Sequence, residues 1–126
     1  MPQTLILVFR QENGNVPFKD WLDELEKKEP RAYAKCLERV LRLSELGYEL
    51  RRPLADDLQG GIRELRARVG TVQYRIFYFF NGPCVAVLSH GCTKEGAVPK
   101  ADIERAIQRK GLVEKNLRKY TAEFEV

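Results

Sequence analysis

The chain has little of what metal centres, disulfide scaffolds and common hydrolases require. Its 126 residues include a single histidine, His90, and three scattered cysteines without a CxxC pair. One histidine excludes a histidine-rich metal site, and the scattered cysteines argue against a disulfide framework or a zinc site. Neither GxxxxGKS/T nor GxSxG is present. We therefore expect no metal, no small-molecule cofactor, and a reducing, cytoplasmic environment.

Long apolar runs are also missing. None approaches the ~20 residues needed to span a bilayer. The N-terminal stretch MPQTLILVFRQENG lacks the charged region of a signal peptide and is typical of a first strand. With 44% hydrophobic and 32% charged residues, the composition is that of a globular protein. We expect one domain over residues 1–126 that does not bind a membrane.

Positive charge is concentrated in the second half of the chain. Residues 1–61 hold 10 Lys/Arg and 11 Asp/Glu, whereas residues 62–120 hold 12 Lys/Arg and 5 Asp/Glu. A one-sided basic surface favours binding of polyanions. A solvated basic face, or a docking face for an acidic protein partner, remains an alternative at this point.

Hydrophobic periodicity predicts helices on both sides of a β-meander. A strand is expected over Thr4–Arg10, and a helical hairpin starts at Pro17, breaks at Glu29-Pro30 and ends near Gly47. A last helix follows Pro99, with Gly111 as its possible end or kink, and the tail over 121–126 is expected to be frayed. These elements predict an α+β, two-layer domain, in which the place of the first strand is left open.

The central stretch, residues 61–99, alternates with period two. In the predicted strand over residues 62–69, Leu65, Ala67 and Val69 share one face, while Glu64, Arg66 and Arg68 share the other. In the next strand, Val72–Phe80, Arg75 shares a face with Phe77 and Phe79. Tight turns are expected at Gly70-Thr71 and at Asn81-Gly82. A third strand, CVAVLSHG, follows.

The outward residues of these strands suit a phosphodiester. Arginine forks match phosphate oxygens, and fixed cations stabilise the negative charge that develops in the transition state. RNA supplies its own nucleophile, the 2′-hydroxyl, so no metal is needed. Candidate catalytic residues are Glu64, Arg66, Arg68, Arg75 and Lys94. Glu64 is the only carboxylate among them and the candidate proton acceptor, although the residues alone favour the alternative that it only forms cross-strand ion pairs. A dyad of Cys92 and His90 lacks an orienting third group.

A family resemblance adds to this interpretation. It rests on Glu64-Leu65-Arg66, on Tyr74-Arg75-Ile76-Phe77-Tyr78, on a hydrophobic strand ending in His90-Gly91, and on Lys94, Pro99 and Ile103-Glu104-Arg105-Ala106. Their order and spacing resemble the toxins of the RelE/ParE superfamily, in particular the HigB-like, phage-derived branch. The resemblance covers residues 4–110.

The resemblance implies a RelE-like fold with a curved antiparallel sheet of about four strands. It also implies a cognate helix-turn-helix antitoxin and ribosome-dependent cleavage of mRNA in the A site. Arg75 matches the phosphate-binding strand arginine, Lys94 a basic residue of the loop before the last helix, and Glu64-Leu65-Arg66 the ELR signature. The expected RNA-binding residues around them are Arg63, Lys100, Arg105 and Arg109.

The sequence departs from the family pattern in two places. The loop over residues 92–98 has one lysine and an added acid, Glu95, where relatives are richer in lysine. No tyrosine follows this loop until Tyr120, so the proton donor for the leaving oxygen is unassigned. Two other functions therefore stay open: a ParE-like toxin that poisons gyrase without cutting nucleic acid, and an inactive relative that only binds an antitoxin.

Overall fold

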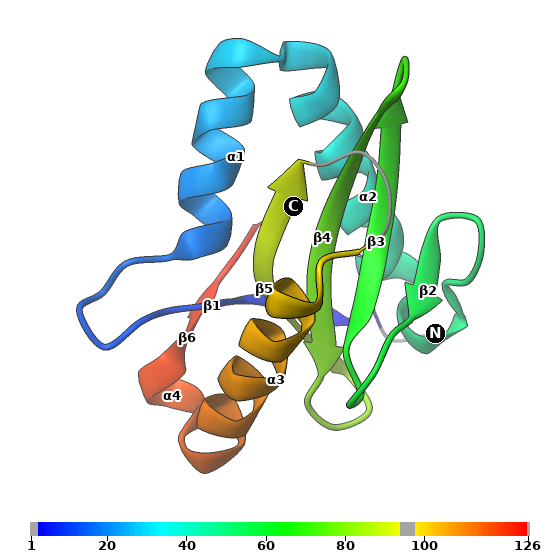
Figure 1. Ribbon diagram of the computed structural model, residues 1–126. Helices are drawn as coiled ribbons and strands as arrows, with labels where there is room; N and C mark the ends of the chain where they lie inside the picture. The colour runs from blue at the N-terminus through cyan, green and yellow to red at the C-terminus, as the bar shows by residue number, and fades with distance from the viewer. Residues whose placement is uncertain (1–2, 94–97, 126) are drawn as a thin grey trace.

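A computed structural model describes residues 3–93 and 98–125, and these residues form one sheet with helices on both faces (Figure 1). The strand order is β2-β3-β4-β5-β1-β6. The elements, in chain order, are β1 (Leu5–Phe9), α1 (Pro17–Lys28), α2 (Pro30–Leu46), the 3₁₀ helix η1 (Gly47–Glu49), β2 (Ala55–Asp57), β3 (Arg63–Val69), β4 (Val72–Phe80), β5 (Val85–Thr93), α3 (Lys100–Lys115), α4 (Leu117–Tyr120) and β6 (Thr121–Glu123).

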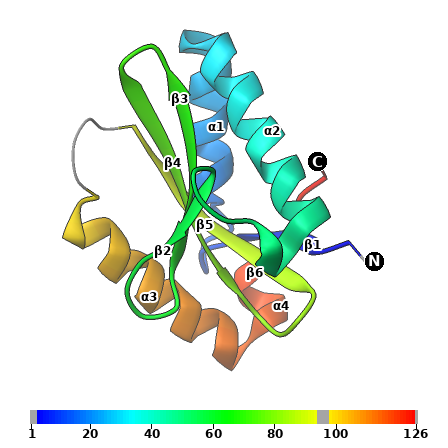
Figure 2. The same cartoon turned by 90° about the vertical axis from the view of Figure 1, so that its right-hand side faces the viewer.

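Each face of the sheet packs against its own helices (Figure 2). Helices α1 and α2 bury residues at helical spacing, such as Leu22 and Val40, against Leu65, Ile76 and other residues of one sheet face. On the opposite face, α3 buries Ala106 and Val113. None of the helices in the described ranges combines the length and hydropathy that crossing a bilayer requires.

The α+β class is confirmed, but the sheet is larger and less regular than predicted. It has six strands in the described residues, and β1 runs parallel to β5 while the other neighbours are antiparallel. The domain also has helices on both sheet faces, where two layers were expected. Strand β2 was missed because its three residues, Ala55–Asp57, show no apolar alternation and depend on pairing with β3.

The end of the chain differs from the frayed tail that we expected. Thr121–Glu123 forms β6 on the open edge of β1, and Phe124 packs edge-to-face on Phe18 with ring centroids 5.5 Å apart. Arg10 donates to the carbonyl of Arg118 at 2.9 Å, which ties α4 to the residue that follows β1. Helix α3 also continues through Gly111 to Lys115.

A glycine sets the approach of α1 to the sheet. An added Cβ at Gly91 would overlap the ring of Trp21, so only glycine lets this indole lie against β5. The indole Nε1 donates to the hydroxyl of Thr93 at 3.2 Å. This contact fixes the end of β5, the strand next to Arg75.

Candidate active site

The register of the central strands gathers polar residues on the face that also carries α3. Arg66 of β3 lies directly opposite Arg75 of β4, and Asp56 of β2 lies opposite Glu64 of β3. Because alternate residues of a strand share a face, these side chains project to the same side of the sheet. Two arginines placed opposite each other repel unless an anion lies between them.

Glu64 is that anion. Its side chain is 0% exposed, and Oε1 accepts from Nε of Arg66 at 2.5 Å. The other carboxylate oxygen, Oε2, lies 4.0 Å from a guanidinium nitrogen of Arg75. Arg66 keeps a third of its side-chain surface exposed, and Arg75 keeps 13%. The carboxylate therefore lies between the two guanidinium groups, and each arginine keeps some surface exposed to solvent.

Asp56 is a member of this cluster that the sequence did not reveal. Its Oδ2 lies 3.1 Å from Arg66 and 2.9 Å from Arg52. The side-chain hydrogen bond from Arg52 is the largest effect that lowers the pKa of Asp56. The available signal was an Asp-Asp pair close to an Arg-Arg pair, but only the pairing of β2 with β3 places Asp56 beside Arg66.

Side chains from α2 support the strand that carries the cluster. Nε of Arg39 donates to the carbonyl of Arg66 at 2.8 Å, and Nζ of Lys35 donates to the carbonyl of Arg68 at 2.8 Å. Strand β3 extends past the short strand β2, so its backbone carbonyls there have no partner strand. The side chains of Arg39 and Lys35 supply the hydrogen bonds that these carbonyls need. The backbone at Arg66 is thus fixed by β4 on one side and by side chains of α2 on the other.

Of the two remaining predicted catalytic residues, Arg68 is described, and it lies outside this cluster. Arg68 is exposed near the β3–β4 turn, where its Nε donates to the carbonyl of Gly70 at 2.9 Å. Lys94 lies outside the described residues. The roles of both residues stay predictions.

The predicted RNA-binding residues are spread over several surfaces. Arg63 faces the α2 side, where it pairs with Asp57 at 2.8 Å, so it is not on the face of Arg75. Lys100 is exposed at the start of α3, and Arg105 pairs with Asp102 at 3.2 Å. Arg109 packs into the structure: its guanidinium lies 4.9 Å from the ring centroid of Phe9, and burial lowers its pKa to about 10.

The contacts of His90 indicate a role in the fold. Its Nε2 lies 3.0 Å from Asp102 Oδ1, and its Nδ1 lies 2.8 Å from the hydroxyl of Ser89. Because a carboxylate only accepts, Nε2 carries the hydrogen and Nδ1 accepts from Ser89. Burial lowers the pKa of His90 to about 4, so the ring is neutral near pH 7. With both ring nitrogens in use, His90 is not placed to activate Cys92.

These features describe a small α+β protein whose sheet displays a preorganised arginine pair suited to a phosphate group. The family model described as Phage derived protein Gp49-like (DUF891) matches residues 20–111, and the chain belongs to this family. The match spans most of the helical hairpin, the cluster and most of α3. Membership supports the toxin–antitoxin context that the sequence resemblance implies, while the HigB-like branch stays a prediction. No curated protein matches the chain.

Proposed function

We propose that this protein is the toxin of a type II toxin–antitoxin system and that it cleaves mRNA on the ribosome without a metal ion. The observation that carries the proposal is the arginine pair, Arg66 and Arg75, held on one sheet face by the buried Glu64. The family supports a toxin-like role, and the sequence resemblance supports the ribosome, the mRNA and a helix-turn-helix antitoxin as partners.

In the proposed reaction, the 2′-hydroxyl of the RNA attacks the adjacent phosphorus while the bond to the 5′-oxygen breaks. The products are a 2′,3′-cyclic phosphate and a free 5′-hydroxyl. Negative charge grows on the phosphoryl oxygens in the transition state, where Arg75 and the exposed part of Arg66 bind them. Lys94, as the sequence predicts, adds a further cation.

Glu64 acts in this proposal as a positioning residue. Its complete burial and its ion pairs favour the cross-strand pairing that the sequence left open as the alternative to proton transfer. His90 is neutral and has both ring nitrogens bonded. We therefore assign to the described residues the stabilisation of charge, and not the proton transfers.

Induced expression followed by mapping of transcript 5′ ends on ribosomes tests the proposal. Wild-type protein should produce cuts within coding regions, and Arg75→Ala should lower their yield by about 10²–10³-fold, as expected for loss of a transition-state donor. Lys94→Ala should abolish growth inhibition as well. Arg31→Ala, on an exposed site of α2, is the matched control and should behave as wild type.

The same experiment separates the other functions. A DNA-damage response without RNA cuts would indicate a gyrase poison. Neither response would indicate a relative that only binds an antitoxin. Full toxicity of both Arg75→Ala and Lys94→Ala would show that the active site lies elsewhere. A short helix-turn-helix protein encoded beside this chain, and purified in complex with it, is the expected partner.

A further inference from the structure

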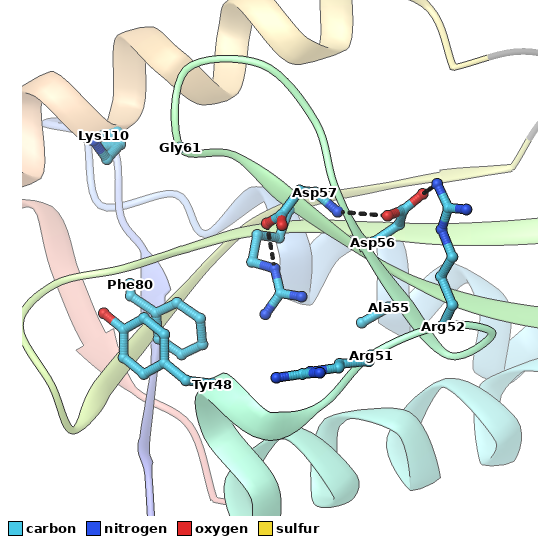
Figure 3. Close-up of a pocket in the computed structure, with 10 residues that line it drawn as sticks. Tyr48, Arg51, Arg52, Ala55, Asp56, Asp57, Gly61, Phe80 and Lys110 are labelled. Atoms are coloured by element: carbon cyan, nitrogen blue, oxygen red, sulfur yellow. Dashed lines mark hydrogen bonds and ion pairs between the residues drawn. The ribbon is translucent and has the colours of Figure 1, made fainter.

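A pocket of about 870 Å³ lies at the edge of the sheet, around strand β2 (Figure 3). It is lined by η1, the segment leading into β2, β2 itself, the start of β3, the end of β4 and one residue of α3. The residues that carry the argument are Tyr48, Arg51, Asp56, Asp57 and Phe80. None of them belongs to the sites predicted from the sequence.

Tyr48 forms a flat aromatic platform in this pocket. Its ring stacks on Phe80, with centroids 3.7 Å apart and planes 17° from parallel. The hydroxyl donates to the carbonyl of Gly82 at 3.0 Å, which fixes the direction of the ring. Tyr48 nevertheless remains 55% exposed. A large aromatic side chain that is held in place on one face and open to solvent is preorganised for stacking with a ligand ring.

The charges around the platform leave one arginine available. Asp56 is paired with Arg52 at 2.9 Å, and Asp57 is paired with Arg63 at 2.8 Å, so both acids in the pocket are neutralised. Arg51 makes no side-chain hydrogen bond or ion pair within residues 3–93 and 98–125. Figure 3 shows its side chain on the same side of the pocket as Tyr48. The Arg51 guanidinium can therefore bind an anion that lies beside the Tyr48 ring.

Ion pairs connect the pocket with the candidate active site. Asp56 lines the pocket and also binds Arg66, at 3.1 Å. Arg66 in turn shares the carboxylate of Glu64 with Arg75. Asp56 and Arg66 therefore join the edge pocket to the Arg75 cluster. Tyr48 and Phe80 lie on the α2 side of the sheet and Arg75 lies on the α3 side, so a nucleic-acid strand bound at Arg75 reaches Tyr48 by turning around the sheet edge at β2.

We propose that the edge pocket binds a nucleotide of single-stranded RNA next to the cleaved phosphodiester, with its base stacked on Tyr48 and its phosphate on Arg51. The inference rests on the proposed function, because it assigns a further subsite to the same substrate. An acidic peptide would use Arg51 alone. A nucleotide uses both the oriented ring and the adjacent cation, since every base offers a π-face and every nucleotide a phosphate.

Binding of a non-cleavable RNA tests the subsite. The probe is a short single-stranded oligonucleotide with 2′-O-methyl riboses. Its binding is measured by fluorescence anisotropy and by the change in the NMR shifts of the Tyr48 ring. Tyr48→Ala and Arg51→Ala should each weaken binding by about tenfold, within the range for loss of one base–aromatic stack. Tyr48→Phe keeps the ring and should bind within about threefold of wild type. The controls Leu46→Ala and Arg31→Ala, at exposed sites outside the pocket, should leave affinity unchanged.

An abasic oligonucleotide of equal length separates stacking from charge. It should bind Tyr48→Ala and wild type equally, because it carries no base to stack. Unchanged affinity of Tyr48→Ala for the intact RNA would overturn the inference. Competition by a poly-glutamate peptide as strong as that by RNA of equal charge would do the same, by assigning the pocket to an acidic protein.

The test of the subsite and the test of the proposed cleavage can fail separately. If transcripts are cut in an Arg75-dependent way but Tyr48→Ala binds RNA normally, only the subsite is wrong. If Tyr48-dependent binding is found but no transcript is cut, only the proposed cleavage is wrong. Thermal melting of each variant checks that lost binding does not reflect unfolding.

Discussion

One row of residues that runs across the strands of the sheet contains two buried polar clusters, and the two clusters have different partners. Asp56 and Glu64 lie at one end of the row, His90 lies at the other, and Phe77 separates them. The Phe77 ring lies 5.0 Å from that of His90. Both clusters bury a titratable side chain and bind it to residues of another strand or helix, so burial alone does not distinguish a site from a scaffold.

The partners of each cluster make the difference. Glu64 is bound to two arginines that retain exposed surface, so its charge is used to hold cations at the surface. His90 is bound to Ser89 and to Asp102 of α3, so its bonds join the helix to the sheet. We infer that the first cluster serves ligand binding and the second serves the fold. Four variants test this comparison, in order of decreasing expected effect on the free energy of unfolding.

Glu64→Gln should have the largest effect, because it removes the anion between two arginines. We expect a loss of about 3 kcal/mol in the free energy of unfolding, at the lower end for breaking a buried ion pair, since Arg66 can regain water. RNA cleavage should fall with it. Urea denaturation provides the measurement, with the exposed Glu104→Gln as control. A loss below about 1 kcal/mol would mean that the arginines do not depend on Glu64.

The pH dependence of the free energy of unfolding measures the contribution of His90. Its pKa is about 4 when folded and 6.5 ordinarily, so the unfolded chain takes up the proton first as the pH falls. Its contribution is complete above pH 6.5 and is lost as the pH falls towards 4. We expect a decrease of about 1.5 kcal/mol between pH 6.5 and 5, because the slope reaches ~1.4 kcal/mol per pH unit only below pH 6.5.

His90→Gln provides the control for this slope. The chain has no other histidine, so the variant should show nearly constant stability over the same pH window. Its stability at pH 7 should be lower, because the bonds to Ser89 and Asp102 are weakened. An equal slope in wild type and variant would show that another group titrates there.

The sequence predicted the part of the first cluster that follows from one strand pair. The alternation in β3 and β4 correctly separated Leu65 and Ala67 from Glu64 and Arg66, and the tight turn at Gly70 set Arg66 opposite Arg75. These features are local, because the side-chain period and the turn length determine them.

The sequence did not reveal what depends on distant segments. Asp56 reaches the first cluster through a strand of three residues, and Asp102 reaches His90 from a helix. Tyr48 of η1 meets Phe80 of β4, which lies 32 positions further along the chain. Such contacts arise from tertiary packing, which propensity and periodicity do not encode.

Asp102→Asn tests whether the His90 cluster is separate from function. The amide keeps the shape but removes the charge that binds His90 and Arg105, so we expect a loss of about 1–2 kcal/mol in the free energy of unfolding. The pKa of His90 should fall further, because Asp102 raises it in the wild type. Cleavage should stay within about twofold of wild type, and a large loss of cleavage without unfolding would contradict the division between the clusters.

Asp56→Asn should have the smallest effect on stability and a measurable effect on function. Its partners Arg52 and Arg66 are partly exposed, so we expect a loss below about 1 kcal/mol in the free energy of unfolding. Arg66 would keep its bond to Glu64 but lose the second acid that fixes its direction. Cleavage should therefore fall about three- to tenfold, consistent with a misplaced cation. Asp23→Asn, at an exposed site on α1, controls for the change in net charge. Equal cleavage by both variants would limit the functional cluster to Glu64 and its arginines.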